Sequence, residues 1–110
     1  MGYLGNLFGK KQSTEMSYNW ITNISKVPVT VACHEMRGPF APFTFDLRPG
    51  EKNGLVPFNA EANVYPAGQY SYDDLEYKLG SGEKWEVRQV LGELIMHKLG
   101  PFERLLRTGV

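Results

Sequence analysis

Apolar and polar residues alternate along much of the chain with a period close to two, which is the pattern of half-buried β-strands. The alternation is clearest over residues 43–47, where Phe43, Phe45 and Leu47 share one parity. Residues 27–33 alternate in the same way, and Pro28, which cannot donate a ladder hydrogen bond, marks the start or an edge of that strand. We therefore expect a strand over each segment, with Phe43, Phe45 and Leu47 facing the core.

Turn-forming residues divide the chain into short segments. They are Arg37-Gly38-Pro39, Pro49-Gly50, Asn53-Gly54, Pro66-Ala67-Gly68 and Gly80-Ser81-Gly82. Further strand candidates lie over residues 18–24, 55–58, 62–65, 70–79 and 85–90, and a change of parity near Asp73-Asp74 indicates a bulge. Short strands with a turn about every 8 to 12 residues are typical of a sandwich or barrel. The sequence thus predicts a mainly all-β fold, a small antiparallel β-sandwich of about seven strands.

The C-terminal part of the sequence fits two patterns. One helical stripe contains Val87, Val90, Leu91, Leu94 and Ile95, although Gly92 interrupts it. We predict a short helix over residues 93–99, ended by Gly100-Pro101, and a strand within residues 93–107 is the alternative.

A tyrosine follows the turn at residues 66–68. In Greek-key sandwiches a tyrosine beside such a turn can donate its hydroxyl hydrogen to the turn backbone. We therefore expect Tyr70 to anchor this turn at the start of the next strand.

Charge and cysteine content narrow the classes of function. The 110 residues make one domain, and 12 acidic residues balance 12 basic ones. Nucleic acid is not an expected partner, because phosphate binding requires an excess of positive charge. Cys33 is the one cysteine, so an intrachain disulfide is excluded, and the N-terminus lacks the apolar region of a signal peptide. We predict an intracellular, cytoplasmic protein.

Cys33 and His34 are the first pair to test for catalysis. Adjacent residues of a strand point to opposite faces, so these two cannot form a nucleophile–base dyad with each other. Zinc-type spacing is absent among Cys33, His34, Glu35 and His97, and no phosphate-binding loop occurs. We predict no catalytic residue, metal or cofactor, and the alternative is a small enzyme that depends on Cys33 or His34.

Residues 1–16 are predicted to form a flexible arm ahead of a single domain over residues 17–110. The arm carries an apolar helical face that is followed by two lysines, which suits either docking into another subunit or contact with a membrane surface. The residues expected to bind a partner or a membrane are Tyr3, Leu4, Leu7, Phe8, Lys10 and Lys11.

Together these features predict a non-enzymatic structural or protein–protein interaction domain. We expect it to self-associate through its aromatic surface and its N-terminal arm, with another copy or another protein as the partner. The alternative is a peripheral, matrix-like protein anchored to a membrane surface by the N-terminal segment.

Overall fold

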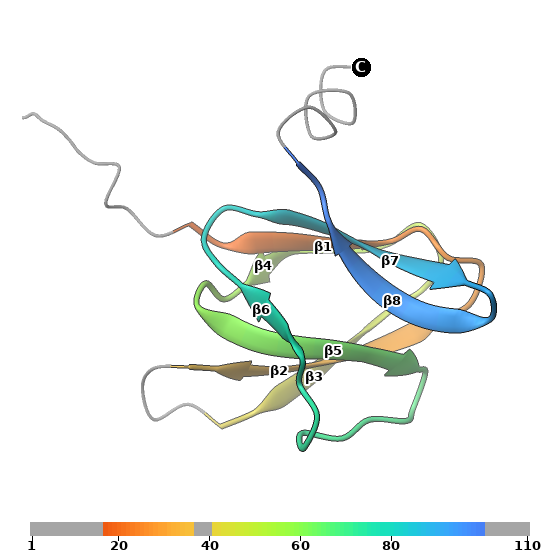
Figure 1. Ribbon diagram of the computed structural model, residues 1–110, viewed down its shortest axis with the longest axis horizontal. Helices are drawn as coiled ribbons and strands as arrows, with labels where there is room; N and C mark the ends of the chain where they lie inside the picture. Colours follow the sequence, from red (N-terminus) through yellow and green to blue (C-terminus); the bar gives the residue numbers. More distant parts are fainter. Residues whose placement is uncertain (1–16, 37–40, 101–110) are drawn as a thin grey trace, which may run out of the picture.

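The computed structural model describes residues 17–36 and 41–100, in which eight strands form two four-stranded sheets (Figure 1). The first sheet has the order β4-β1-β7-β8, and the second has the order β3-β2-β5-β6. The strands are β1 (Asn19–Asn23), β2 (Val29–Glu35), β3 (Phe43–Leu47), β4 (Lys52–Val56), β5 (Ala60–Pro66), β6 (Tyr77–Leu79), β7 (Lys84–Val90) and β8 (Glu93–Lys98). The predicted all-β, sandwich-like fold is confirmed.

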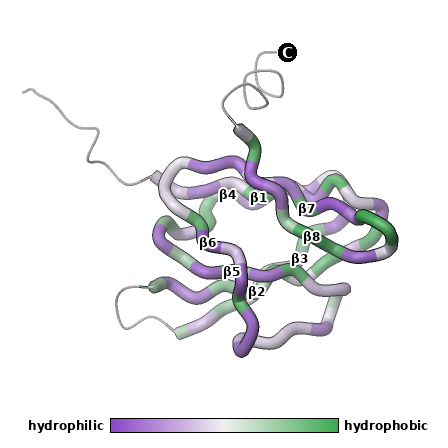
Figure 2. The backbone as a smooth tube through the Cα atoms, viewed as in Figure 1, coloured by the Kyte–Doolittle hydropathy of each residue, from purple (hydrophilic) through white to green (hydrophobic). Residues whose placement is uncertain are grey.

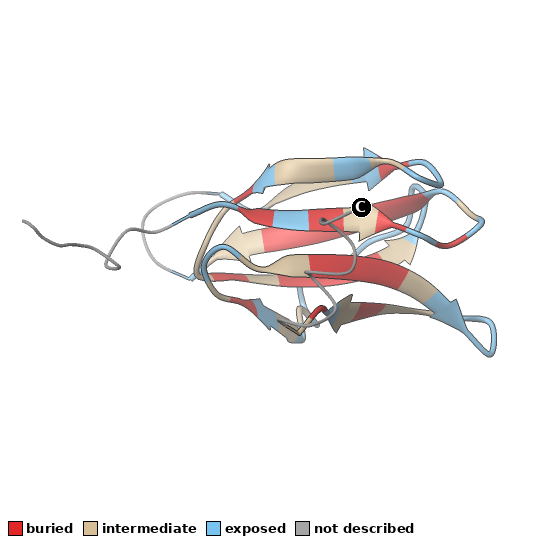
Figure 3. Cartoon of the chain, turned by 90° about the horizontal axis from the view of Figure 1, so that it is seen from above, coloured by how far each residue is buried: buried red, intermediate tan, exposed pale blue. Residues whose placement is uncertain are grey.

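The core lies between the two sheets, and both contribute to it. Hydrophilic and hydrophobic residues alternate along several strands (Figure 2), and both sheets contain buried residues (Figure 3). Because successive side chains of a strand point to opposite faces, each sheet turns an apolar face inward. The first sheet contributes Ile21, Val56, Trp85, Val87 and Met96, and the second contributes Val29, Val31, Cys33, Leu47, Ala62, Val64 and Leu79.

Strand β3 has the parity that the sequence predicts. Leu47 is 4% exposed, and Phe43 and Phe45 are half-buried residues that pack against the core. Their rings stack with centroids 6.3 Å apart. The strand pairs with β2 along its whole length, so the inward-facing side chains of the two strands lie next to each other and pack together.

One pair of neighbouring strands departs from the antiparallel prediction. Strands β1 and β7 run parallel, with Trp20 opposite Lys84 and Asn23 opposite Val87. A parallel pair cannot be closed by a hairpin, and here the intervening chain passes through β4 and the whole second sheet before returning. The alternation of apolar residues predicts which face a strand buries, but it carries no information on the direction of the neighbouring strand.

The predicted helix over residues 93–99 is wrong. Residues 93–98 form β8, which pairs antiparallel with β7 from Val90 opposite Glu93 to Trp85 opposite Lys98. Leu91 and Gly92, with φ angles of 52° and 84°, are the two central residues of the connecting turn. Gly92 therefore serves as a turn residue, and positive φ at both positions is the type I′ geometry that closes a tight hairpin.

Strand β1 buries its odd-numbered residues, two of which are asparagines. Asn19, Ile21 and Asn23 are completely buried, whereas Trp20 and Ile24 are 39% and 47% exposed. The two asparagines face inward because their side chains hydrogen-bond backbone groups of the loops that close the sandwich. As a consequence, the bulky apolar residues of this strand lie on the outer face of the first sheet.

The predicted anchor at Tyr70 is wrong, and a different tyrosine holds this loop. Tyr70 lies outside the strands and is 52% exposed. Tyr65, in β5, donates its hydroxyl hydrogen bond to the carbonyl oxygen of Ser71 at 3.1 Å and also contacts the carboxylate of Asp74. The anchor therefore comes from the strand before the turn rather than from the residues after it.

Candidate binding face around Trp20

The outer face of the first sheet carries a pocket of about 620 Å³. Ligand pockets in proteins are typically about 300–1,000 Å³ in volume and lined by apolar side chains with a few polar groups. Strand β1 supplies the floor through its outward-facing residues Trp20 and Thr22, together with Ile24 just beyond its end. The remaining lining residues are Lys52, Lys84, Trp85, Glu86 and Leu99.

Trp20 lies against the backbone of β4 at Gly54. A Cβ atom placed on Gly54 would come within 3.1 Å of the indole ring, which is closer than carbon atoms pack. Glycine at this position therefore allows the ring to lie flat on the neighbouring strand. The indole is held in a fixed orientation while 39% of the residue stays exposed.

Two lysines converge on this indole from the strands on either side of β1. The Nζ atom of Lys52 lies 4.7 Å from the ring centroid, and that of Lys84 lies 5.7 Å from it. Both distances are within the range of a cation–π interaction. Neither ammonium group forms an ion pair with a carboxylate in the described part of the chain, so the pocket presents an aromatic surface under net positive charge.

The acidic residue of the pocket is compensated differently. Glu86 is 4% exposed, and its carboxylate pairs with the guanidinium of Arg88 at 2.9 Å. Arg88 follows two residues later on β7 and therefore shares the outer face with Glu86. The negative charge of Glu86 is thus neutralised by Arg88 of the same strand. Lys52 and Lys84 are therefore the charged groups of the pocket that can interact with a partner.

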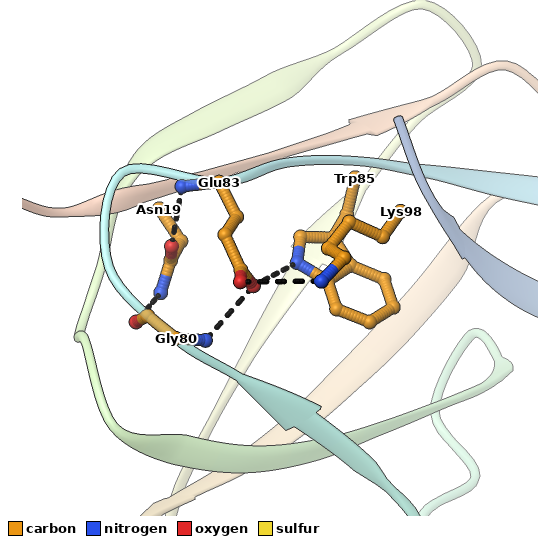
Figure 4. A network of polar contacts seen from close by, with 5 residues as sticks. All are labelled: Asn19, Gly80, Glu83, Trp85 and Lys98. Atoms are coloured by element: carbon orange, nitrogen blue, oxygen red, sulfur yellow. Dashed lines mark hydrogen bonds and ion pairs between the residues drawn. The ribbon is translucent and has the colours of Figure 1, made fainter. Parts of the chain in front are cut away.

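A polar network fixes the turn that leads into β7 (Figure 4). Glu83 accepts hydrogen bonds from the backbone N–H of Gly80 at 2.8 Å and from the indole N–H of Trp85 at 3.0 Å. Asn19 accepts from the backbone N–H of Glu83 at 2.8 Å and donates to the carbonyl oxygen of Gly80 at 2.9 Å. These bonds hold the start of β7, and with it the backbone of Lys84, in place beside Trp20.

Cys33 is placed as a core residue. It is fully buried, and burial raises the pKa of its thiol to about 12. The thiolate is the nucleophilic form of cysteine, so this side chain is chemically inert near neutral pH. His34 follows on the opposite face of β2, and His97 lies on β8 in the other sheet. The described residues contain no group of three or more histidine, cysteine or acidic residues that could hold a metal ion.

The sequence-predicted binding residues lie outside the described part of the chain. They are Tyr3, Leu4, Leu7, Phe8, Lys10 and Lys11. The sequence analysis missed Trp20, Lys52 and Lys84, which are brought together by the pairing of β4, β1 and β7. A usable indication was present in β1, where Asn19 and Asn23 share the parity of Ile21 and Trp20 has the opposite parity.

No known family model matches the chain, no curated protein matches it, and no solved structure matches its fold. In the residues that the structure describes, we find no helix with the length and apolar character needed to cross a bilayer.

Proposed function

We propose that this protein is a non-enzymatic interaction domain that self-associates through the outer face of its β4-β1-β7-β8 sheet. The main support is the exposed indole of Trp20, in a pocket beneath two lysines that form no ion pair within residues 17–36 and 41–100. Tryptophan is enriched among the residues that dominate binding energy at interfaces, because it combines a large apolar area with few rotatable bonds.

The surroundings of Trp20 support a binding surface over a catalytic site. Ile24 and Val90, each 47% exposed, extend the apolar surface beyond the end of β1. A contiguous exposed apolar surface rimmed by polar residues marks an interaction site more often than a chance feature. The N-terminal arm is proposed to add a second contact between copies, through the apolar residues Tyr3, Leu4, Leu7 and Phe8.

Sedimentation over a range of protein concentrations tests the proposal. We expect the full chain to show reversible self-association, and we expect Trp20→Ala to weaken it while the far-ultraviolet circular dichroism stays unchanged. Tyr70→Ala is the control, since Tyr70 is an aromatic residue that is 52% exposed and lies outside this sheet. A wild-type protein that is monomeric at every concentration would contradict self-association.

A further inference from the structure

Leu91, at the tip of the β7–β8 hairpin, combines two unfavourable features. It is 99% exposed, and its backbone has a φ angle of 52°, in the left-handed region. Asparagine, aspartate and glycine suit the first central position of a type I′ turn, because a Cβ atom is crowded in the left-handed region and the polar side chains of asparagine and aspartate offset this with local hydrogen bonds. A backbone outlier of this kind is a reason to look for a function at that residue. A leucine that neither packs in the core nor suits its turn indicates that its side chain is used by a partner.

The hairpin tip and the Trp20 pocket belong to the same sheet. Trp20 and Ile24 are four residues apart along an extended strand, which corresponds to about 13 Å. The backbone N–H of Ile24 donates to the carbonyl of Val87, so Leu91 lies a further four positions along β7, or about 13 Å. Ile24, which also lines the near end of the pocket, is therefore close to the midpoint between Trp20 and the hairpin tip.

The two ends of this line differ in charge, although Lys26 also borders the hairpin end beside Val90. The pocket end carries the ammonium groups of Lys52 and Lys84, both directed at the Trp20 ring. The hairpin end carries the carboxylate of Glu93, which is exposed, opposite Val90 in the ladder, and without an ion pair in the described part of the chain. A second copy turned end for end would bring each carboxylate toward the lysines of the other copy.

We infer that two copies of this chain pair about a two-fold axis near Ile24, with Leu91 of each copy inserted into the Trp20 pocket of the other. Ile24, at the axis, then meets Ile24 of the partner subunit. An isologous interface of this kind needs one self-complementary surface, and a protrusion and a pocket at equal distances from one midpoint provide it. This inference deepens the proposed self-association and rests on it, since it assigns the residues and the symmetry of that contact.

Replacement of Leu91 separates binding from folding. Leu91→Asn removes the inserted side chain, and asparagine tolerates the left-handed backbone better than leucine does. We expect the dimer dissociation constant to rise at least about tenfold, which is the effect of losing one well-buried leucine. At low concentration, where both proteins are monomeric, we expect the thermal midpoint of the variant to equal or exceed that of the wild type. Met36→Asn is the control, because Met36 is 46% exposed and directly follows β2, in the other sheet.

Charge reversal tests the orientation of the pair. We expect Glu93→Lys alone and Lys84→Glu alone each to weaken the dimer, and the double variant to recover part of the loss, because the exchanged charges attract again across the interface. Two losses that simply add in the double variant would overturn the end-for-end arrangement. Ile24→Asp would place two like charges at the axis and should weaken the dimer more than either single reversal.

The outcomes distinguish this inference from the proposed function. If Trp20→Ala dissociates the dimer and Leu91→Asn leaves it intact, the sheet face mediates self-association and the insertion of Leu91 is wrong. If the wild-type chain never associates, both proposals are wrong. If Leu91→Asn lowers the thermal midpoint of the monomer, leucine at the turn stabilises the fold itself, and the inferred role in binding is overturned.

Discussion

The side-chain amide of Asn23 donates a hydrogen bond to the backbone carbonyl of Leu47 at 3.0 Å, and so connects the end of β1 to the end of β3 across the two sheets. The same amide donates to the carbonyl of Val27 at 2.8 Å, and its oxygen accepts from the backbone and the hydroxyl of Ser25. The Asn23 side chain is fully buried and takes part in all four of these hydrogen bonds. One asparagine therefore shapes the β1–β2 loop and ties it to the opposite sheet.

Removal of this amide should be among the most damaging single changes in the chain. Asn23→Ala leaves a buried carbonyl and a loop without their partners, and each unsatisfied buried group costs about 1–3 kcal/mol. We expect the free energy of unfolding to fall by at least about 2 kcal/mol in denaturant melts. Asn53→Ala is a control, because the Asn53 side chain accepts a single, solvent-exposed hydrogen bond, from the N–H of Leu55. Equal stability of the two variants would contradict the structural role of Asn23.

Tyr65, which precedes the 66–72 loop, and Tyr70, which lies within it, should respond differently to loss of the hydroxyl group. Tyr65→Phe keeps the ring and deletes the hydrogen bonds to Ser71 and Asp74, so we expect a loss of about 1 kcal/mol. Tyr70→Phe should leave the melting midpoint unchanged, because Tyr70 is half exposed and its hydroxyl has no partner in the described part of the chain. A reversed order of the two effects would restore Tyr70 as the anchor of the turn.

Cys33 should be unreactive in the folded protein and should make stability depend on alkaline pH. Burial raises the pKa of its thiol from 9.0 to about 12. The folded state therefore holds the thiol proton more tightly than the unfolded state does, so this contribution to stability is complete below pH 9 and is lost as the pH rises toward 12. We expect Ellman titration at pH 8 to label the unfolded chain at once and the native chain slowly.

The matched variant for that measurement is Cys33→Ala. It should be modestly less stable at neutral pH because it leaves a small cavity. It should also lose less stability than the wild type between pH 9 and pH 12. Rapid labelling of native Cys33 would contradict its placement in the core, and loss of a biological activity in folded Cys33→Ala would contradict a non-enzymatic role.

Deletion of residues 1–11 tests the contribution of the N-terminal arm. Four bulky apolar residues could each contribute about 1.5–3 kcal/mol if buried against a partner, while ordering the backbone costs about 1–2 kcal/mol per residue. We expect the truncated chain to keep the circular dichroism spectrum of the full chain and to self-associate more weakly in sedimentation. Equal sedimentation, together with flotation of the full chain but not the truncated chain on liposomes, would favour a membrane-contacting arm instead.

Local patterns in the sequence were sufficient to predict the β-rich sandwich and the inward face of β3. Phe43, Phe45 and Leu47 alternate with polar residues, and a strand that pairs along its whole length simply places that face on the core. Glycine and proline positions likewise marked the turns, because these residues restrict or release the backbone dihedral angles whatever surrounds them.

The same reasoning failed where a side chain obtained its role from a distant segment. The helical stripe over residues 87–95 predicted a helix from residue 93, and residues 93–98 instead form β8 because the edge of β7 supplies hydrogen-bonding partners along the whole segment. The pocket shows the same dependence, since Trp20, Lys52 and Lys84 are dispersed in the sequence.

Side-chain alternation and turn chemistry act over a few residues, and they therefore define the class of fold without any long-range contact. Tertiary structure alone decided which face of β1 is buried. Asn19 and Asn23 could enter the core only because carbonyl groups of Pro57, Gly80, Val27 and Leu47 are there to accept their hydrogen bonds. Once the asparagines face inward, the period of two directs Trp20 and Ile24 to the outer surface, where the binding face is formed.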